Sequence, residues 1–192
     1  MASIHHTTMT PGKLELLADW LPRQSWYAGG AEAPERIRAG GFRLDDPAGE
    51  VGIEFMIVVE AGAPEPAAYL VPMAYRGAAL DGACDDALIG VSEHGVLGTR
   101  WIYDGVRDPV VMGQLHAVLR GEATPQHQSE SDTPDPTVAV YGGDAADVLD
   151  VRVNRVLRPV EAEEGAPGRL VAGWTRPDGT AVRGVLVTFA SR

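Results

Sequence analysis

Residues 51–60 read VGIEFMIVVE and carry the clearest β-strand pattern in this sequence of 192 residues. The odd-numbered positions hold only valine, isoleucine and phenylalanine, whereas the even-numbered positions include Glu54 and Glu60. Side chains of a strand point alternately to its two faces. The alternation therefore predicts a strand with one strongly apolar face.

Further strands are predicted on either side of residues 51–60. Residues 69–75 alternate in the same way, but Pro72 has no N–H to donate to a neighbouring strand. Proline is typical of an edge strand or a bulge, so we expect one of these at residues 69–75. Other strand patterns cover residues 87–92 and 96–103, and a weaker one covers residues 37–44, kinked at Gly40-Gly41.

Two helices are predicted. The first opens at Thr10, with Pro11 in its first turn and an apolar stripe through residues 14–21. The second is better marked, because Asp108 is a good N-cap, a proline follows it, and Gly121 lies just beyond the last apolar residue.

Residues 121–137 read GEATPQHQSESDTPDPT and contain no leucine, isoleucine, valine or aromatic residue. Such a composition cannot offset the entropy that ordering costs, so it predicts a flexible linker or long loop. Residues 176–179 read RPDG and predict a turn, because proline fixes φ and glycine accepts a positive φ. Strand patterns after residue 137 cover residues 138–141, 148–157, 169–174 and 181–189.

The elements together predict an α+β fold. Strands and helices do not alternate regularly, so a curved antiparallel sheet with packed helices is favoured over a doubly wound sheet. We expect an α+β domain over residues 1–120, a linker over 121–137, and a small β-rich region over 138–192 packed on the first domain.

Composition excludes several kinds of partner. Acids outnumber bases 27 to 16, and the net charge of -11 disfavours binding to nucleic acid or to an anionic membrane. No segment approaches the 18 apolar residues that a membrane span would need, and residues 1–11 lack a secretory signal pattern. A cytoplasmic protein is expected. Cys84 is the single cysteine, which excludes an internal disulfide.

The motifs of common enzyme classes are missing. Residues 90–95 read GVSEHG, close to the Gly-x-Ser-x-Gly of serine hydrolases, but His94 replaces the second glycine and a polar turn is favoured. Lys13 is the only lysine, and no Gly-Lys-Ser or Gly-Lys-Thr occurs. The adjacent acids Asp45 and Asp46 are interpreted as solvated loop charge. We expect no catalytic residue, cofactor or metal site.

Two stretches nevertheless resemble a known family. Residues 20–29, WLPRQSWYAG, resemble the W-L-P-x-Q-R-W-F/Y-A-G that opens the N-terminal cap of actinobacterial maltokinases and related aminosugar kinases. Residues 98–109, GTRWIYDGVRDP, resemble a later stretch of the same cap that precedes a helix. The two lie in the family's order, and the resemblance covers about residues 12–120. Ser25 and Gly30 depart from it, where the family has Arg and Lys.

The resemblance implies a cystatin-like cap, in which a curved sheet holds a helix and no residue is catalytic. The kinase catalytic lobe has no counterpart in these residues, so a stand-alone cap-like protein is expected. In the family the cap is thought to serve regulation or association with enzymes of trehalose and α-glucan metabolism. The candidate structural anchors or contact residues are Trp20, Trp26, Tyr27, Trp101, Tyr103 and Asp104.

Two functions from different classes remain open. The first is a non-catalytic module that binds or regulates a kinase or another enzyme of sugar metabolism, through residues 20–27 or an edge strand near Pro72. The second is a sugar-binding protein with a pocket on the concave face of the sheet, lined by Tyr69, Tyr75, Trp101 and Tyr103. A homodimer is compatible with either function.

Overall fold

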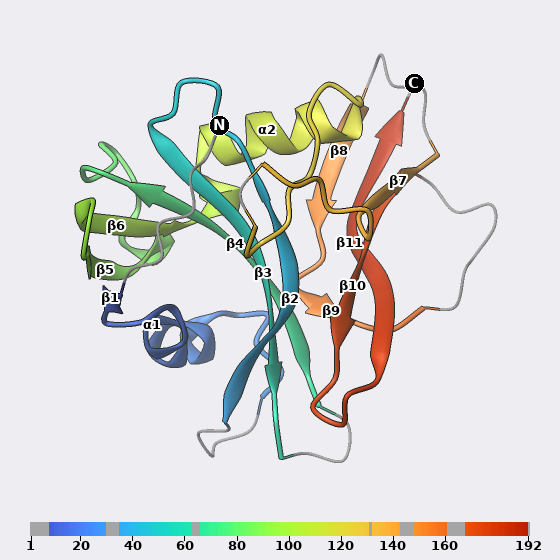
Figure 1. The fold of residues 1–192 in the computed structure, drawn as a ribbon, viewed down its shortest axis with the longest axis horizontal. Coiled ribbons are helices and arrows are strands. Elements are labelled where there is room, and N and C mark those ends of the chain that lie inside the picture. Colours follow the sequence, from blue (N-terminus) through green and yellow to red (C-terminus); the bar gives the residue numbers. More distant parts are fainter. Residues whose placement is uncertain are drawn as a thin grey trace.

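The computed structural model describes residues 8–29, 35–62, 66–130, 132–142, 148–160 and 168–191. Within them, eleven strands form one antiparallel sheet in the order β1-β5-β6-β4-β3-β2-β10-β11-β8, with β7 beside β10 and β9 beside β4 (Figure 1). Two helices pack on this sheet, α1 (Lys13–Trp20) and α2 (Pro109–Leu119). The strands are β1 (Met9–Thr10), β2 (Arg36–Leu44), β3 (Val51–Glu60), β4 (Ala68–Arg76), β5 (Leu88–His94), β6 (Gly98–Asp104), β7 (Ala139–Tyr141), β8 (Val148–Val153), β9 (Val156–Leu157), β10 (Gly168–Thr175) and β11 (Ala181–Ser191). The α+β antiparallel fold is confirmed, and its cystatin-like form stays a prediction.

The sheet carries an apolar core on each face. On one face, α2 packs with Phe55 and Ile57 of β3 and with Trp174 of β10. On the other face, α1 packs with Met56 and Val58 of β3. The strand predicted over residues 51–60 is confirmed, but both of its faces are buried rather than one, because each is covered by a helix.

Helix α1 begins later than its sequence predicts. Thr10 belongs to β1, where it pairs with Glu93 of β5, so its backbone is extended. Gly12 is the extended N-cap of the helix, and the Glu15 carboxylate accepts a hydrogen bond from its N–H at 2.5 Å. The prediction of a helix starting at Thr10 was wrong because strand pairing competes with the local proline signal.

Helix α2 matches its prediction. The carboxylate of Asp108 accepts hydrogen bonds from the N–H groups of Val110 and Val111, as an N-cap should. The four residues that the apolar pattern predicts to face the core are the ones that are buried, namely Val111, Leu115, Val118 and Leu119. Gly121 follows the helix with a φ of 73°, a conformation that glycine adopts without strain.

Strand β4 is an inner strand, not an edge strand. It pairs with β3 along its whole length on one side. On the other side it pairs first with β9 and then with β6. The N–H of Leu70 points to this second side, toward Arg155, so the nitrogen of Pro72 faces the gap between β9 and β6. The prediction of an edge or a bulge was wrong, because in the described residues β4 has neighbours on both sides and pairs with β3 without a register shift. The missing N–H costs nothing in that gap.

Residues 121–137 lie along the sheet in their described part. Arg43 of β2 and Gln126 exchange backbone hydrogen bonds of 2.9 Å each, and the N–H of Asp135 donates to Pro125 at 2.9 Å. The described part is thus a long loop, one of the two forms that the composition predicts, and it is held against the sheet because backbone pairing requires no apolar side chain. The division of the chain around this segment stays a prediction.

The C-terminal strands continue the same sheet. Strand β10 pairs with β2 through Trp174 and Gly40, and with β11 along its length. The strand predicted over residues 148–157 is split into β8 and β9 at Asn154, which donates its backbone N–H and its side-chain amide to carbonyls of β11. The predicted turn between β10 and β11 is confirmed, with Gly179 at a φ of 85°.

Candidate functional site

Strand β3 places two buried glutamates on the face that α1 covers. Glu54 is 3% exposed and Glu60 is 5% exposed. They share this face with Met56 and Val58, which belong to the apolar core under α1. A buried carboxylate is costly unless it is paired and hydrogen-bonded, so the partners of each glutamate define what it can do.

Glu54 is surrounded by donors from three other segments. Lys13 of α1 donates to Oε2 at 2.6 Å, and the hydroxyl of Tyr75 in β4 donates to the same oxygen at 2.6 Å. Gln128 donates its amide to Oε1 at 3.0 Å. Burial, and after it the charge of Glu54, raises the pKa of Tyr75 well above its usual value. The Tyr75 hydroxyl therefore keeps its proton and serves as a donor to the carboxylate.

Glu60 forms a second polar cluster at the far end of β3. Oε1 accepts hydrogen bonds from the Tyr27 hydroxyl at 2.8 Å and from Nε of Arg36 at 3.0 Å. Oε2 accepts from the Tyr69 hydroxyl at 3.4 Å. Burial, followed by the charge of Glu60, raises the pKa of Tyr69 to about 12. Burial and the hydrogen bond to Glu60 also raise the pKa of Tyr27.

The predicted aromatic residues of the first motif lie against this face. Trp20 is buried and meets Trp26 edge-on, with ring centroids 5.8 Å apart. Tyr27 stacks on Tyr69 at 5.5 Å, and the guanidinium of Arg155 lies 5.1 Å from the centre of the Trp26 ring. The motif thus wraps the end of α1 back onto β4, and its large side chains contact other parts of the fold.

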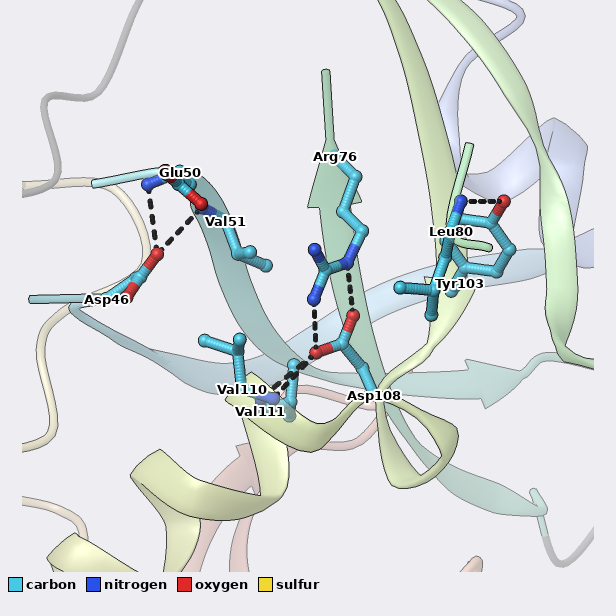
Figure 2. Close-up of polar contacts among 9 residues, drawn as sticks. All are labelled: Asp46, Glu50, Val51, Arg76, Leu80, Tyr103, Asp108, Val110 and Val111. Carbon is cyan, nitrogen blue, oxygen red and sulfur yellow. Dashed lines mark hydrogen bonds and ion pairs between the residues drawn. The ribbon is translucent and has the colours of Figure 1, made fainter. Parts of the chain in front are cut away.

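The predicted residues of the second motif lie at the end of β6. Asp104 is buried, and Nη2 of Arg155 donates to its two carboxylate oxygens at 2.7 Å and 2.5 Å. Tyr103 is buried in the core on the α2 face, and its hydroxyl accepts a hydrogen bond from the N–H of Leu80 at 3.0 Å (Figure 2). Trp101 is half-buried against the same core. Each of the three is held by contacts inside the fold.

Two further aspartates hold the chain at turns (Figure 2). Asp108 joins the start of α2 to Arg76 of β4. Asp46 is buried and accepts hydrogen bonds from the N–H groups of Ala48, Glu50 and Val51, at 3.0, 2.9 and 2.9 Å. The interpretation of Asp46 as solvated charge was wrong, because its carboxylate caps the turn that leads into β3.

Ser92 and His94 both belong to β5, and the polar turn predicted for residues 90–95 begins only after His94, at residues 95–97. The Ser92 hydroxyl donates to the carbonyl of Pro11 at 2.8 Å. Nδ1 of His94 accepts hydrogen bonds from the N–H groups of Val96 and Leu97. Both side chains are committed to local structure, so their arrangement is not that of a nucleophile and its base.

The four aromatic residues expected to line a sugar pocket do not lie together. Tyr69 and Tyr75 belong to the core under α1, whereas Trp101 and Tyr103 belong to the core under α2. The sheet separates the two pairs, so one pocket lined by all four is excluded. The alternation within each strand was predicted correctly. Alternation alone does not show which side chains of different strands lie on the same face of the sheet.

No candidate metal site is found in the described ranges, since they contain no group of three or more metal-ligating side chains. Neither α-helix there has the length and apolar character needed to cross a membrane.

The motif at residues 20–29 thus packs the end of α1 on the sheet, and the motif at residues 98–109 includes the end of β6 and the start of α2. A comparison with protein families finds a match that covers the first motif and all but the last residue of the second. Residues 20–108 match the maltokinase N-terminal cap domain. The resemblance stated above is confirmed for these residues, which we call the cap region. A comparison with curated proteins finds no match for the chain.

Several features of the cap region explain its motifs. Gly29 ends the first motif where an added Cβ would collide with the Tyr27 hydroxyl and the Glu60 carboxylate. Asp104 and Asp108 of the second motif are the buried partners of Arg155 and Arg76. Of the two departures from the family pattern, Ser25 is exposed and Gly30 lies outside the described residues.

Sequence reasoning missed the most connected polar groups of the cap region. Glu54 and Glu60 carry a recognisable signal, because they share one face of a strand with Met56 and Val58. An acid on an otherwise apolar strand face is expected to have a buried partner. Arg155 carries no such signal, since its contacts with Trp26 and Asp104 bridge residues far apart in the sequence.

Proposed function

We propose that this chain is a non-catalytic cap module that binds or regulates a partner enzyme, either a kinase or another enzyme of trehalose, α-glucan or aminosugar metabolism. The observation that carries the proposal is the match of residues 20–108 to the maltokinase N-terminal cap domain. The proposal describes a cytoplasmic protein without a cofactor of its own.

The contacts of four buried acids in the cap region support this proposal. The carboxylates of Glu54, Glu60, Asp104 and Asp108 each accept hydrogen bonds from basic side chains of the same chain. A general acid or base must exchange its proton with a substrate, which a carboxylate enclosed by such partners does poorly. These acids are better suited to holding a rigid shape than to catalysis.

An exposed apolar surface in the cap region is the proposed contact with the partner. Val91 of β5 is 39% exposed, and Val96 and Leu97, in the turn between β5 and β6, are 63% and 44% exposed. Apolar side chains grouped at the surface mark sites of protein interaction. We call this group the hairpin patch.

Co-purification tests the proposal. The tagged chain is expressed in its source cell, and proteins retained with it are identified. We expect an enzyme of sugar metabolism to be retained by the parent chain and lost from Val96→Asp/Leu97→Asp. The matched control, Val160→Asp, alters an exposed valine outside the cap region and should retain the enzyme.

Two outcomes would contradict the proposal. Recovery of the chain alone would contradict the binding of a partner enzyme. Equal retention of the enzyme by the hairpin variant would contradict the contact assigned to the hairpin patch. A thermal-shift series with maltose, trehalose and glucosamine checks the alternative. Stabilisation by a neutral sugar would favour a sugar-binding protein instead.

A further inference from the structure

Strand β2 presents three arginines on the face that α1 covers. Its register places Arg36 opposite Glu60, Arg38 opposite Val58, and Arg43 opposite Glu54 of β3. Residues opposite one another in an antiparallel pair point to the same face. Because Val58 packs under α1, all three arginines project from that face of the sheet.

Only one of these arginines has an ion-pair partner within the described residues. Arg36 pairs with Glu60 at 2.9 Å. Arg43 lies directly opposite Glu54, a position where opposite charges usually pair, yet it makes no ion pair there. The oxygens of Glu54 are already occupied by Lys13, Tyr75 and Gln128. Among the residues that the structure describes, the guanidinium groups of Arg43 and of Arg38, which lies opposite an apolar residue, therefore have no ion-pair partner.

Lys13 and Arg43 both adjoin Glu54, Lys13 through its ion pair and Arg43 through the strand register. Lys13 is 5.3 Å from the centre of the Tyr75 ring. The charges of Arg43 and Arg38 both act to lower the pKa of Tyr75, against the larger effects of burial and Glu54. Both guanidinium groups thus lie close enough to the Tyr75 hydroxyl to influence it.

The charges of this cluster do not balance. Lys13, Arg38 and Arg43 stand against the single carboxylate of Glu54, an excess of two positive charges in a chain whose net charge is -11. A phosphate monoester carries a charge of about -1.5 to -2 near neutral pH. Guanidinium groups bind phosphate through paired hydrogen bonds, and an ammonium adds a point charge.

We propose that Lys13, Arg38 and Arg43 bind the phosphate group of a phosphorylated small molecule on this face of β2. Arg38 is exposed, and Arg43 and Lys13 are half-buried, so the site is open to solvent. The Lys13–Glu54 pair holds one cation in place, and the two arginines supply the remaining donors. This assignment is independent of whether the hairpin patch binds a partner enzyme.

Calorimetry on the full chain at low ionic strength tests this site. The probes are inorganic phosphate, glucose 6-phosphate, glucose and sulfate. We expect both phosphate compounds to bind and glucose not to bind. Arg38→Gln and Arg43→Gln should each weaken binding by about tenfold, the loss expected for a charge-assisted hydrogen bond. Arg152→Gln is the matched control, since it removes the same charge from an exposed position on β8.

The outcomes separate a built site from general attraction. Equal binding of sulfate and phosphate, unchanged in the two site variants, would mean an adventitious ion only and would overturn the proposal. So would the absence of any binding at about 10 mM phosphate. Thermal unfolding of each variant without ligand shows whether it keeps its fold, and both arginines are accessible enough that we expect it to.

Discussion

Arg76 of β4 donates hydrogen bonds to both carboxylate oxygens of Asp108, from Nε to Oδ2 at 2.6 Å and from Nη2 to Oδ1 at 2.9 Å (Figure 2). Asp108 has no exposed surface, and the same carboxylate caps the first turn of α2. One side chain therefore fixes the helix to the sheet and satisfies the free N–H groups at its start.

Replacing Asp108 should be severely destabilising. Asp108→Ala removes the helix cap and leaves Arg76 without its partner in a mostly buried position. We expect the free energy of unfolding to fall by about 3 kcal/mol or more, because breaking a buried pair costs more than breaking an exposed one. Urea unfolding followed by circular dichroism measures the change.

The control for Asp108 is the exposed ion pair of Arg120 with Glu122. Glu122→Ala should produce no measurable change, because solvent screens such pairs. Equal effects of the two substitutions would show that burial does not govern the strength of these contacts.

Arg155 should be required for the packing of Trp26. Its guanidinium covers the Trp26 ring and holds the buried Asp104 carboxylate. Arg155→Ala should lower stability by about 3 kcal/mol. It should also shift tryptophan fluorescence to longer wavelength as the ring gains solvent. Arg158→Ala, which alters an exposed arginine nearby, should change neither quantity. An unshifted spectrum in Arg155→Ala would contradict the packing role.

Stability should fall at alkaline pH because of Tyr69. Its pKa is raised to about 12 by burial and by Glu60, whereas an unperturbed tyrosine ionises near 10.0. Between these values the unfolded state has lost a proton that the folded state keeps, so stability is full below pH 10 and is lost as the pH rises toward 12. Tyr69→Phe should make this decline less steep and leave the part that comes from Tyr27 and Tyr75, whose pKa values are also raised. Urea unfolding at several pH values checks it, and an equally steep decline in the variant would assign the effect elsewhere.

Two glycine substitutions should act in opposite directions. Gly113 lies inside α2 with open space around it, so Gly113→Ala should stabilise the chain by up to about 1 kcal/mol, or about 2–4 °C in Tm.

Gly41 has a φ of 124°, and a Cβ there would collide with the carbonyl of Phe55. Gly41→Ala should therefore destabilise by about 2 kcal/mol. Calorimetric scans compare the two, and stabilisation by both would contradict the strain assigned to Gly41.

The sequence predicted best what depends on neighbouring residues. Asp108, the apolar positions of α2 and Gly121 each carry a local signal. The helix has the N-cap that this signal predicts. Gly179 did the same for the last turn. Pro72 shows the limit of such signals, because whether its missing N–H matters depends on β6 and β9, which are distant in the sequence.

The polar clusters were the hardest part to predict. Glu54 receives its partners from α1, from β4 and from the segment around Gln128, and only the folded topology brings these together. Composition predicted a linker or a long loop for residues 121–137, but it could not predict the backbone pairing beside Arg43 that holds the described part of this loop against the sheet. Patterns of single residues cannot report such pairings.

Trp174 and Gly40 form the registered pair that ties β10 to β2, and the side chain of Trp174 belongs to the core shared with Phe55 and α2. A recombinant fragment ending at residue 108 would thus lack α2 and the strands β10 and β11, and the apolar sheet face that they cover would be exposed to solvent. We therefore expect a chain cut at residue 108, where the family match ends, to be less soluble than the full chain. Fragments intended for biochemistry should extend through β11.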